Sequence, residues 1–174
     1  MQATIQENNM RKIKIEKITL NIGTGMPGEK LDKAVKLLQK MTEMTYVITK
    51  TKKRIPTWGI RPGLEIGCKV TVRGKKAYTI LKNMLAALNN TISSSKFDST
   101  GNLSFGVNEY INIPTVEYDP VIGIIGIEIA VTLARPGFRI RRRVIKNRTI
   151  PKSHFITKDE AIEFIKSNFN VQVN

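Results

Sequence analysis

Apolar and polar residues alternate along three stretches in the first half of the chain, as they do in a β-strand with one buried face. The first stretch is 13–22, where the alternation slips once at Glu16-Lys17, so we predict a strand with a bulge at that point. The second, 46–51, is short and rich in β-branched residues, and the third is 65–73. Each of the three is predicted to be a strand.

Apolar residues instead recur every three or four positions along three other stretches, which is the spacing of an amphipathic helix. These helices are predicted at 29–43, at 75–88 and at 158–168. Thr157 and Glu160 have the spacing of a capping box, in which each side chain accepts a hydrogen bond from a free backbone N–H at the helix start. The last helix is therefore predicted to begin immediately after Thr157.

Further strands are predicted between the second and the last helix. Residues 103–107 and 110–113 look like the two arms of a hairpin, and residues 124–133 are rich enough in Ile and Val to form a central strand. Strands then outnumber helices about two to one, and several connections are too short to hold a crossover helix. We predict an α+β fold with a mostly antiparallel (mixed) sheet of about five strands.

Helices are expected to pack on one face of this sheet and to leave the opposite face open and polar. The open face is predicted to carry no carboxylate and to present Lys17, Thr19, Asn21, Thr49, Lys69, Thr71 and Arg73. We expect one domain over 1–174, with a long basic loop at 52–63 and a basic segment at 135–152.

Basic residues far outnumber acidic ones, with 29 Lys and Arg against 14 Asp and Glu, a formal net charge of +15. Three long intervals contain basic residues and no carboxylate: Glu43 to Glu65, Glu65 to Asp98, and Glu128 to Asp159. A solvated surface normally interleaves both signs, because clustered like charges repel one another. The intervals therefore predict a polyanionic partner that supplies the missing counter-charge.

Folded RNA fits this composition better than a membrane or DNA does. The basic stretches lack the bulky apolar face of a membrane-binding helix, and no helix-turn-helix, zinc-finger or basic-zipper pattern is present. Aromatic residues make up 6% of the chain, too few for a base-stacking sheet. The side chains predicted to contact RNA are Lys17, Thr19, Asn21, Thr49, Lys50, Lys69, Thr71, Arg73, Arg139, Arg141, Arg142 and Arg143. A DNA-binding or chromatin-associated protein remains the main alternative, because it needs the same charge.

The small motifs give weak signals for other chemistry. Segment 23–28 matches GxGxxG, but Pro27 removes a backbone N–H and no βαβ repeat follows, so we interpret it as a tight turn. An NADP-dependent oxidoreductase that uses this loop remains a distant alternative. Cys68 alternates with apolar neighbours and is predicted to be a core residue, whereas His154 is interpreted as RNA-facing or on the surface. One Cys and one His cannot form a disulfide or a structural zinc site, and we expect no enzyme, metal or cofactor.

Trp58 has two interpretations, because it lies in the basic loop 52–63 among Pro and Gly residues. In the first it folds back as a local plug, and in the second it contacts a flat RNA surface from the loop tip. The polar stretch 1–10 lacks the apolar core of a secretory signal, and no apolar run is long enough to span a bilayer. A cytoplasmic protein without membrane contact is therefore expected.

Several short motifs resemble those of the universal large-subunit ribosomal protein five (L-five) family. They are 17–23 (KITLNIG), 48–50 (ITK), 66–74 (IGCKVTVRG), 105–109 (FGVNE), 113–114 (IP) and 118–119 (YD). The resemblance runs from about residue 14 to the end of the chain, and the stretch 66–74 is its most specific part. From RPGF at 135–138 onward, the chain is similar to the archaeal and eukaryotic form of the family.

This resemblance implies a protein that binds 5S rRNA and helps attach it in the central protuberance of the large ribosomal subunit. It further implies contacts with large-subunit rRNA, with P-site tRNA through a long loop, and with neighbouring ribosomal proteins that include a small-subunit bridge protein. Asn21, Thr49, Thr71 and Arg73 match the family's 5S-binding face. The loop 52–63 matches its tRNA-facing loop, with Lys52, Lys53, Arg54, Trp58 and Arg61 as the side chains concerned.

Overall fold

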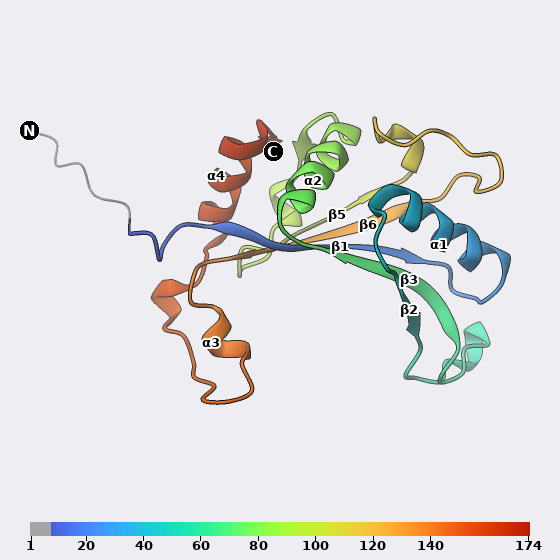
Figure 1. The fold of residues 1–174 in the computed structure, drawn as a ribbon, viewed down its shortest axis with the longest axis horizontal. Helices are drawn as coiled ribbons and strands as arrows, with labels where there is room; N and C mark the ends of the chain where they lie inside the picture. Colours follow the sequence, from blue (N-terminus) through green and yellow to red (C-terminus); the bar gives the residue numbers. More distant parts are fainter. Residues whose placement is uncertain (1–7) are drawn as a thin grey trace, which may run out of the picture.

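The computed structural model describes residues 8–174, so most of the polar stretch 1–10 lies outside the described residues (Figure 1). Five strands form one sheet in the order β2-β3-β1-β6-β5, and each of its pairings is antiparallel. These strands are β1 (Lys14–Gly23), β2 (Val47–Lys50), β3 (Glu65–Val72), β5 (Leu103–Val107) and β6 (Ile127–Ala134). Two short strands, β4 (Thr91–Ile92) and β7 (Gln172–Val173), pair in parallel apart from this sheet. The predicted α+β class and antiparallel five-stranded sheet are confirmed.

The three long helices lie on one side of the sheet, and a one-turn helix lies on the other (Figure 1). The long helices are α1 (Glu29–Thr42), α2 (Lys75–Ala87) and α4 (Lys158–Phe169), and the short one is α3 (Arg139–Arg142). Single 3-10 turns occur at η1 (Pro56–Trp58), η2 (Ser94–Lys96), η3 (Tyr110–Asn112) and η4 (Lys152–His154). Helix α4 begins with the predicted capping box, and both of its reciprocal hydrogen bonds are present.

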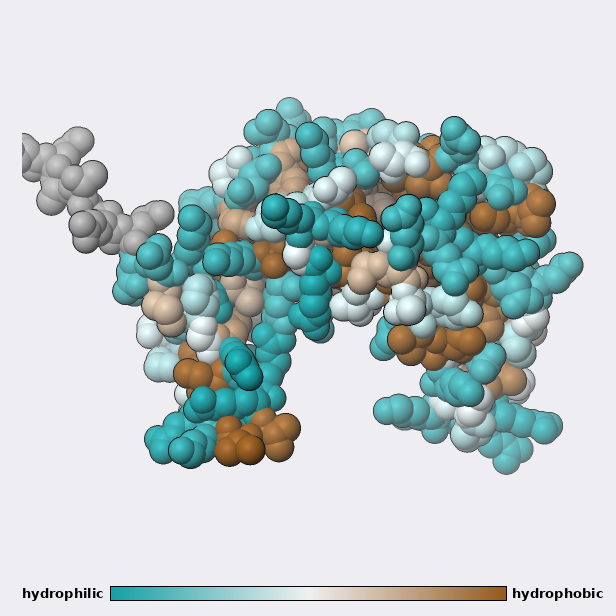
Figure 2. Space-filling view, viewed as in Figure 1, coloured by the Kyte–Doolittle hydropathy of each residue, from teal (hydrophilic) through white to brown (hydrophobic). Residues whose placement is uncertain are grey.

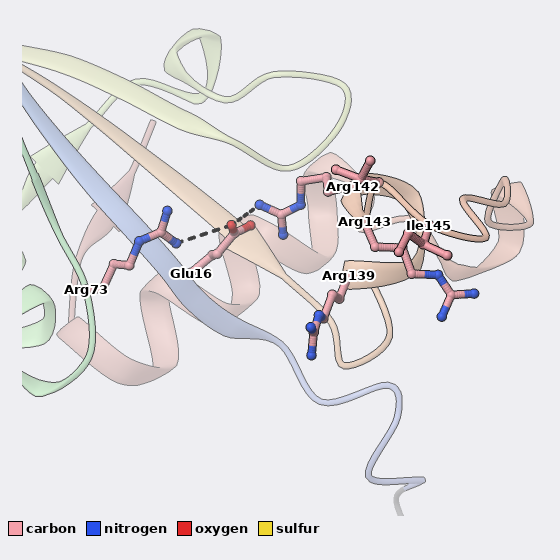
Figure 3. Close-up of a pocket in the computed structure, with 7 residues that line it drawn as sticks. Glu16, Arg73, Arg139, Arg142, Arg143 and Ile145 are labelled. Atoms are coloured by element: carbon pink, nitrogen blue, oxygen red, sulfur yellow. Dashed lines mark hydrogen bonds and ion pairs between the residues drawn. The ribbon is translucent and has the colours of Figure 1, made fainter.

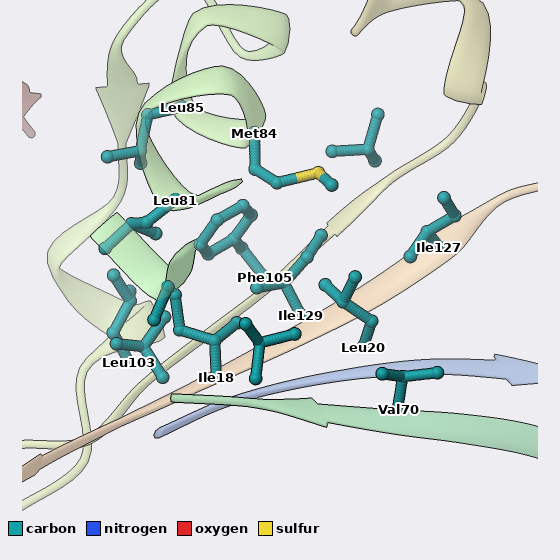
Figure 4. Close-up of a cluster of buried hydrophobic side chains, with 14 of the residues drawn as sticks. Ile18, Leu20, Val70, Leu81, Met84, Leu85, Leu103, Phe105, Ile127 and Ile129 are labelled. Carbon is teal, nitrogen blue, oxygen red and sulfur yellow. The ribbon is translucent and has the colours of Figure 1, made fainter. Parts of the chain in front are cut away.

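The core lies between the sheet and the long helices (Figure 4). Ile18 and Leu20 of β1 are fully buried against Leu81 and Leu85 of α2 and neighbouring apolar side chains. Cys68 of β3 is also fully buried, which confirms its predicted place in the core. Because alternate residues of a strand point to opposite faces, this packing directs the intervening polar residues to the other face of the sheet.

The predicted bulge in β1 is confirmed, but the predicted hairpin is wrong. The pairing of β1 with β6 shifts register between Ile15 and Lys17, which leaves one extra residue on β1. Strand β5 pairs with β6, whereas 110–113 forms a 3-10 turn instead of a second arm. Tyr110 and Ile113 are both buried, and a three-residue spacing of buried side chains suits a helical turn and not a strand.

Candidate nucleic-acid interface

The open face of the sheet is the roof of an arch. Two projections leave the sheet on this side: the loop leg, residues 52–63, between β2 and β3, and the arginine leg, residues 135–152, after β6 (Figure 1). Figure 2 shows the hollow between the two legs, bordered by many hydrophilic side chains and by hydrophobic patches on both legs. The sequence predicted the basic loop, the basic segment and the open face as separate features, and the fold places all three on one side.

The predicted sheet residues lie on the roof and are neighbours there. Pairing of β1 with β3 places Thr19 opposite Thr71 and Asn21 opposite Lys69. Their side chains are half-buried or exposed, whereas Ile18, Leu20 and Ile22 between them are buried. Lys17, Thr49, Lys50 and Arg73 complete the predicted set on the roof or its edge. Hydroxyl, amide and cationic donors therefore share one surface.

The prediction of a roof without carboxylates is wrong. The outward positions of β1, β3 and β6 also hold Glu16, Glu65 and Glu128. Asn21 Nδ2 donates to Glu128 Oε2 at 2.9 Å, and Lys50 Nζ lies 3.2 Å from Glu65 Oε1. The error has two sources: Glu65 lies in phase with Gly67 and Lys69 on β3 and was left out of the predicted face, and the pairing of β1 with β6 brings Glu128 beside Asn21.

Glu16 joins the roof to the arginine leg. Its Oε1 lies 3.5 Å from Arg73 Nη1 and also accepts a hydrogen bond from Arg142 Nη1, and the two arginines approach it from different sides (Figure 3). Burial by itself raises the pKa of Glu16, but Arg142, Lys17 and Arg73 outweigh it, so the net pKa lies below the ordinary value. The carboxylate is therefore ionised at neutral pH.

An open cavity of about 640 Å³ lies around this carboxylate (Figure 3). Its lining consists of Glu16, Arg73, Arg139, Arg142, Arg143, Val144 and Ile145. The lining residues include four arginines and one glutamate, a formal charge of 4 − 1 = +3, and the Arg73 and Arg142 guanidinium groups are the two that approach Glu16 (Figure 3). Guanidinium groups present planar forks of N–H donors that suit phosphate oxygens. The cavity therefore has the chemistry of an anion site.

Arg135 anchors the arginine leg through a buried guanidinium group. From the sequence, it was counted among the basic residues without an acidic partner. The Arg135 side chain is 5% exposed, and it donates to the carbonyl oxygens of His154 and Phe155 and, at 2.7 Å, to Glu160 Oε1. Arg135 is therefore a structural residue and not an RNA contact. The assumption that no acid pairs with the arginines of 135–152 is wrong for Arg135 and for Arg142.

His154 also belongs to the interior of the arginine leg. Its Nε2 lies 3.0 Å from the Pro136 carbonyl oxygen, and its ring packs edge-on against Phe138. His154 is half-buried and packs within the leg, so an RNA-facing role for its ring stays a prediction. By contrast, Arg139, Arg141 and Arg143 are exposed, and none of them has a carboxylate within 4.0 Å among residues 8–174.

The loop leg is a hydrogen-bonded extension of β2 and β3. The Thr51 amide donates to the Leu64 carbonyl oxygen at 2.9 Å, and Ile55 and Ile60 form a β-bridge nearer the tip. Trp58 is 72% exposed at the tip, so the plug interpretation is wrong. The cations of this leg are exposed, with no acidic partner within 4.0 Å in the part of the chain that the structure describes: Lys52, Lys53, Arg54 and Arg61.

Sequence reasoning missed a second hollow on the roof. It has a volume of about 600 Å³, and its lining includes Thr19, Asn21, Ser95, Lys96, Ser104, Gly106 and Glu128. Ser104 and Gly106 alternate with buried residues of β5, a signal that the hairpin interpretation obscured. Lys96 comes from η2, which is too short to have a hydrophobic period.

The motifs considered for other chemistry have structural roles. The amides of Thr24 and Gly25 both donate to the Ile66 carbonyl oxygen, so segment 23–28 is a turn held against β3. Burial raises the pKa of the Cys68 thiol to about 11, which keeps it protonated. Among residues 8–174, no cluster of three potential metal ligands occurs and no helix is long and apolar enough to cross a membrane.

Comparison with known families places the chain among the ribosomal proteins. Residues 8–61 match the family described as ribosomal protein L5, and residues 65–164 match the C-terminal region of the same ribosomal family. The chain belongs to the ribosomal protein L5 family.

Its relatives match along nearly their whole length. Large ribosomal subunit protein uL5 of Sulfurisphaera tokodaii is 50% identical over 174 residues, which cover 99% of this chain and 98% of that protein. The protein of the same name from Nanoarchaeum equitans is 51% identical over 168 residues, 96% of this chain and 99% of the relative. The predicted family, its structural role in the large subunit and its non-enzymatic character are confirmed.

Proposed function

We propose that this large-subunit protein binds 5S rRNA on the roof of the arch and helps attach it in the central protuberance. The observation that carries the proposal is the placement of hydroxyl, amide and cationic side chains on one open face between two basic legs. Structured RNA presents 2′-hydroxyls and phosphates across a shallow minor groove, and such donors suit both. The roof residues concerned are Lys17, Thr19, Asn21, Thr49, Lys50, Lys69, Thr71 and Arg73.

The two legs have different proposed partners. The arginine leg contacts rRNA, including that of the large subunit, through Arg139, Arg141, Arg142 and Arg143. The loop leg reaches P-site tRNA with Lys52, Lys53, Arg54, Trp58 and Arg61, because its exposed tip combines cations with one aromatic ring that suits a base or a flat RNA surface. The family resemblance supports a further contact with a small-subunit bridge protein.

Single substitutions test whether the roof binds 5S rRNA, and a control removes one positive charge from another part of the surface. Arg73→Ala and Asn21→Ala are each expected to weaken 5S rRNA binding by about 1–3 kcal/mol in filter binding. Lys36 is exposed on α1, on the side of the sheet opposite the roof. Lys36→Ala removes the same charge as Arg73→Ala and is expected to weaken 5S rRNA binding much less. Circular dichroism checks the fold of each variant. Equal affinity of wild type, Arg73→Ala and Asn21→Ala would refute the roof as the RNA site.

Competition separates RNA from DNA. A salt titration first measures the electrostatic share of binding. If the arch neutralises roughly 6 to 10 phosphates, raising salt from 50 to 200 mM is expected to weaken binding about 10³- to 10⁵-fold, by the rule for duplexes.

In the competition assay at fixed salt, DNA of equal length is expected not to displace 5S rRNA. Displacement by such DNA would favour a general polyanion-binding protein over the proposed function.

A further inference from the structure

Glu16 is out of place on a surface that binds a polyanion. It lies on the roof beside Lys17, at the bulge of β1, and it faces the cavity formed by four arginines. A carboxylate at this position repels phosphate and reduces the charge of the cavity from +4 to +3. Its side chain is 14% exposed, so it is also partly desolvated. Such a residue needs a role that outweighs this repulsion.

We propose that Glu16 is a positioning residue for RNA binding, which holds Arg73 of the roof and Arg142 of the arginine leg in the orientation that receives backbone phosphates. This inference rests on the proposed function, because it assigns a role within the same interface. Within residues 8–174, Glu16 makes the one ion pair within 4.0 Å that links the arginine leg to the sheet.

The bonding pattern allows both arginines to serve two partners. Arg73 and Arg142 each approach Glu16 Oε1 through Nη1. A guanidinium group has five N–H donors, so most of the donors of each arginine remain available. The two side chains are 59% and 51% exposed, and phosphate oxygens can therefore reach them from the solvent side. Glu16 thus orients the two groups without covering them.

The β-bulge explains how the carboxylate reaches this position. In a regular strand, Glu16 and Lys17 would point to opposite faces. The extra residue between Ile15 and Lys17 leaves both half-buried on the open side, while Ile15 and Ile18 remain in the core. Bulges commonly re-aim a side chain in this way. The same irregularity therefore brings an anion to the junction of the roof and the arginine leg.

A positioning role and simple charge repulsion predict opposite changes in 5S rRNA affinity for Glu16→Gln. Without its counter-charge, each arginine samples many rotamers, and ordering such a side chain on binding costs about 0.5–1.5 kcal/mol. For two arginines, this corresponds to affinity for 5S rRNA that is about 5- to 150-fold weaker. If Glu16 only repels phosphate, the same substitution makes binding tighter, because the cavity gains one unit of positive charge.

The experiment compares 5S rRNA affinities, by filter binding at fixed salt, of wild type, Glu16→Gln, Glu16→Asp and Glu128→Gln. Glu128→Gln is the matched control, since Glu128 is a carboxylate on the same roof that bonds Asn21 and no arginine among residues 8–174. We expect Glu16→Gln to weaken binding, Glu16→Asp to retain most of it, and Glu128→Gln to leave it equal or tighter. Equal or tighter binding by Glu16→Gln would overturn the proposal.

A double-variant background distinguishes positioning from a general structural defect. In a chain that carries Arg73→Ala and Arg142→Ala, nothing remains for Glu16 to orient, so Glu16→Gln is expected to have no weakening effect there. A weakening of the same size in that background would also overturn the proposal. If the chain that carries both Arg73→Ala and Arg142→Ala binds 5S rRNA as tightly as wild type, the proposed function and this inference both fail. If the double variant binds 5S rRNA more weakly and Glu16→Gln does not, the positioning role alone fails.

Discussion

The stability of the arginine leg is expected to depend on the charge of Glu160. Glu160→Gln keeps a side chain that can complete the capping box with Thr157, because Gln also serves at that position. What it removes is the negative charge 2.7 Å from the Arg135 guanidinium, whose side chain is 5% exposed. The substitution therefore isolates the ion pair from the helix cap.

The exposure of the two partners sets the magnitude. Removing one partner of a fully buried pair costs about 3–5 kcal/mol, because a charge is left buried without compensation. The Glu160 side chain is 40% exposed, so water already screens part of the interaction, and exposed pairs contribute about 0.2–1 kcal/mol. We expect Glu160→Gln to lower the free energy of unfolding by about 1–3 kcal/mol. For a chain of this length, that is a decrease in Tm of roughly 2–12 °C.

The effect also has a defined pH dependence. Burial acts to raise the pKa of Glu160, but the Thr157 backbone N–H and the Arg135 guanidinium outweigh it, and the net pKa lies below the ordinary value. A carboxylate with a depressed folded pKa contributes stability that is present above its unfolded pKa and is lost as the pH falls through the folded value. The difference in the free energy of unfolding between wild type and Glu160→Gln is therefore expected to have its full size at pH 7 and to shrink below about pH 4.

Urea denaturation followed by circular dichroism measures the effect, in wild type and in an Arg135→Met background. With the guanidinium removed, Glu160 has no buried charge to neutralise, so Glu160→Gln is expected to cost little there. An equal cost in both backgrounds, or a cost at pH 7 that persists unchanged at pH 3, would refute the assignment of the effect to this ion pair.

The remaining predictions concern the loop leg, the buried thiol and a glycine of β3. Deletion of 55–61 is expected to spare 5S rRNA binding and to impair tRNA positioning on the ribosome, because the loop leg projects away from the roof; loss of 5S binding would place the loop in the rRNA site. Cys68 is expected to resist a thiol reagent in the native protein and to react on unfolding, because it is buried with its pKa raised to about 11; rapid native labelling would contradict this. Gly67→Ala is expected to destabilise the sheet by about 1–3 kcal/mol in urea denaturation, because its Cβ would lie 2.6 Å from the Ile22 carbonyl oxygen. Gly106→Ala is its control, since the nearest atom there lies 3.7 Å away.

The elements predicted correctly are those long enough to show a period. Helix α1 and strand β3 each repeat their apolar spacing several times, and the slip in the alternation of β1 marks its bulge in the sequence itself. The one-turn helix α3 and the two-residue strand β7 each span about one period, so no apolar spacing repeats along them and they could not be predicted in this way. Local pattern therefore accounts for most of the fold and misses its shortest parts.

The ion pair of Glu16 with Arg142 and the hydrogen bond of Asn21 to Glu128 were not predictable, because they join distant parts of the chain. Glu16 and Arg142 are separated by 126 positions, and Asn21 and Glu128 by 107. Their proximity depends on the pairing of β1 with β6, which the alternation of either strand alone does not specify. Counting charges along the sequence therefore found the excess of cations correctly but assigned Arg135 to the wrong role.

The spacing of the two legs is a property of the fold and not of any motif. Strand β1 places Gly23 beside β3 at the loop-leg end and Lys14 beside Ala134 at the arginine-leg end. Ten residues of strand separate these ends by about 30 Å, at roughly 3.3 Å per residue. That distance is about four Debye lengths at physiological ionic strength, so small anions would screen each leg independently. The loop leg can therefore hold one RNA while the roof and the arginine leg hold another, which fits the proposed division between P-site tRNA at the loop leg and 5S rRNA at the roof.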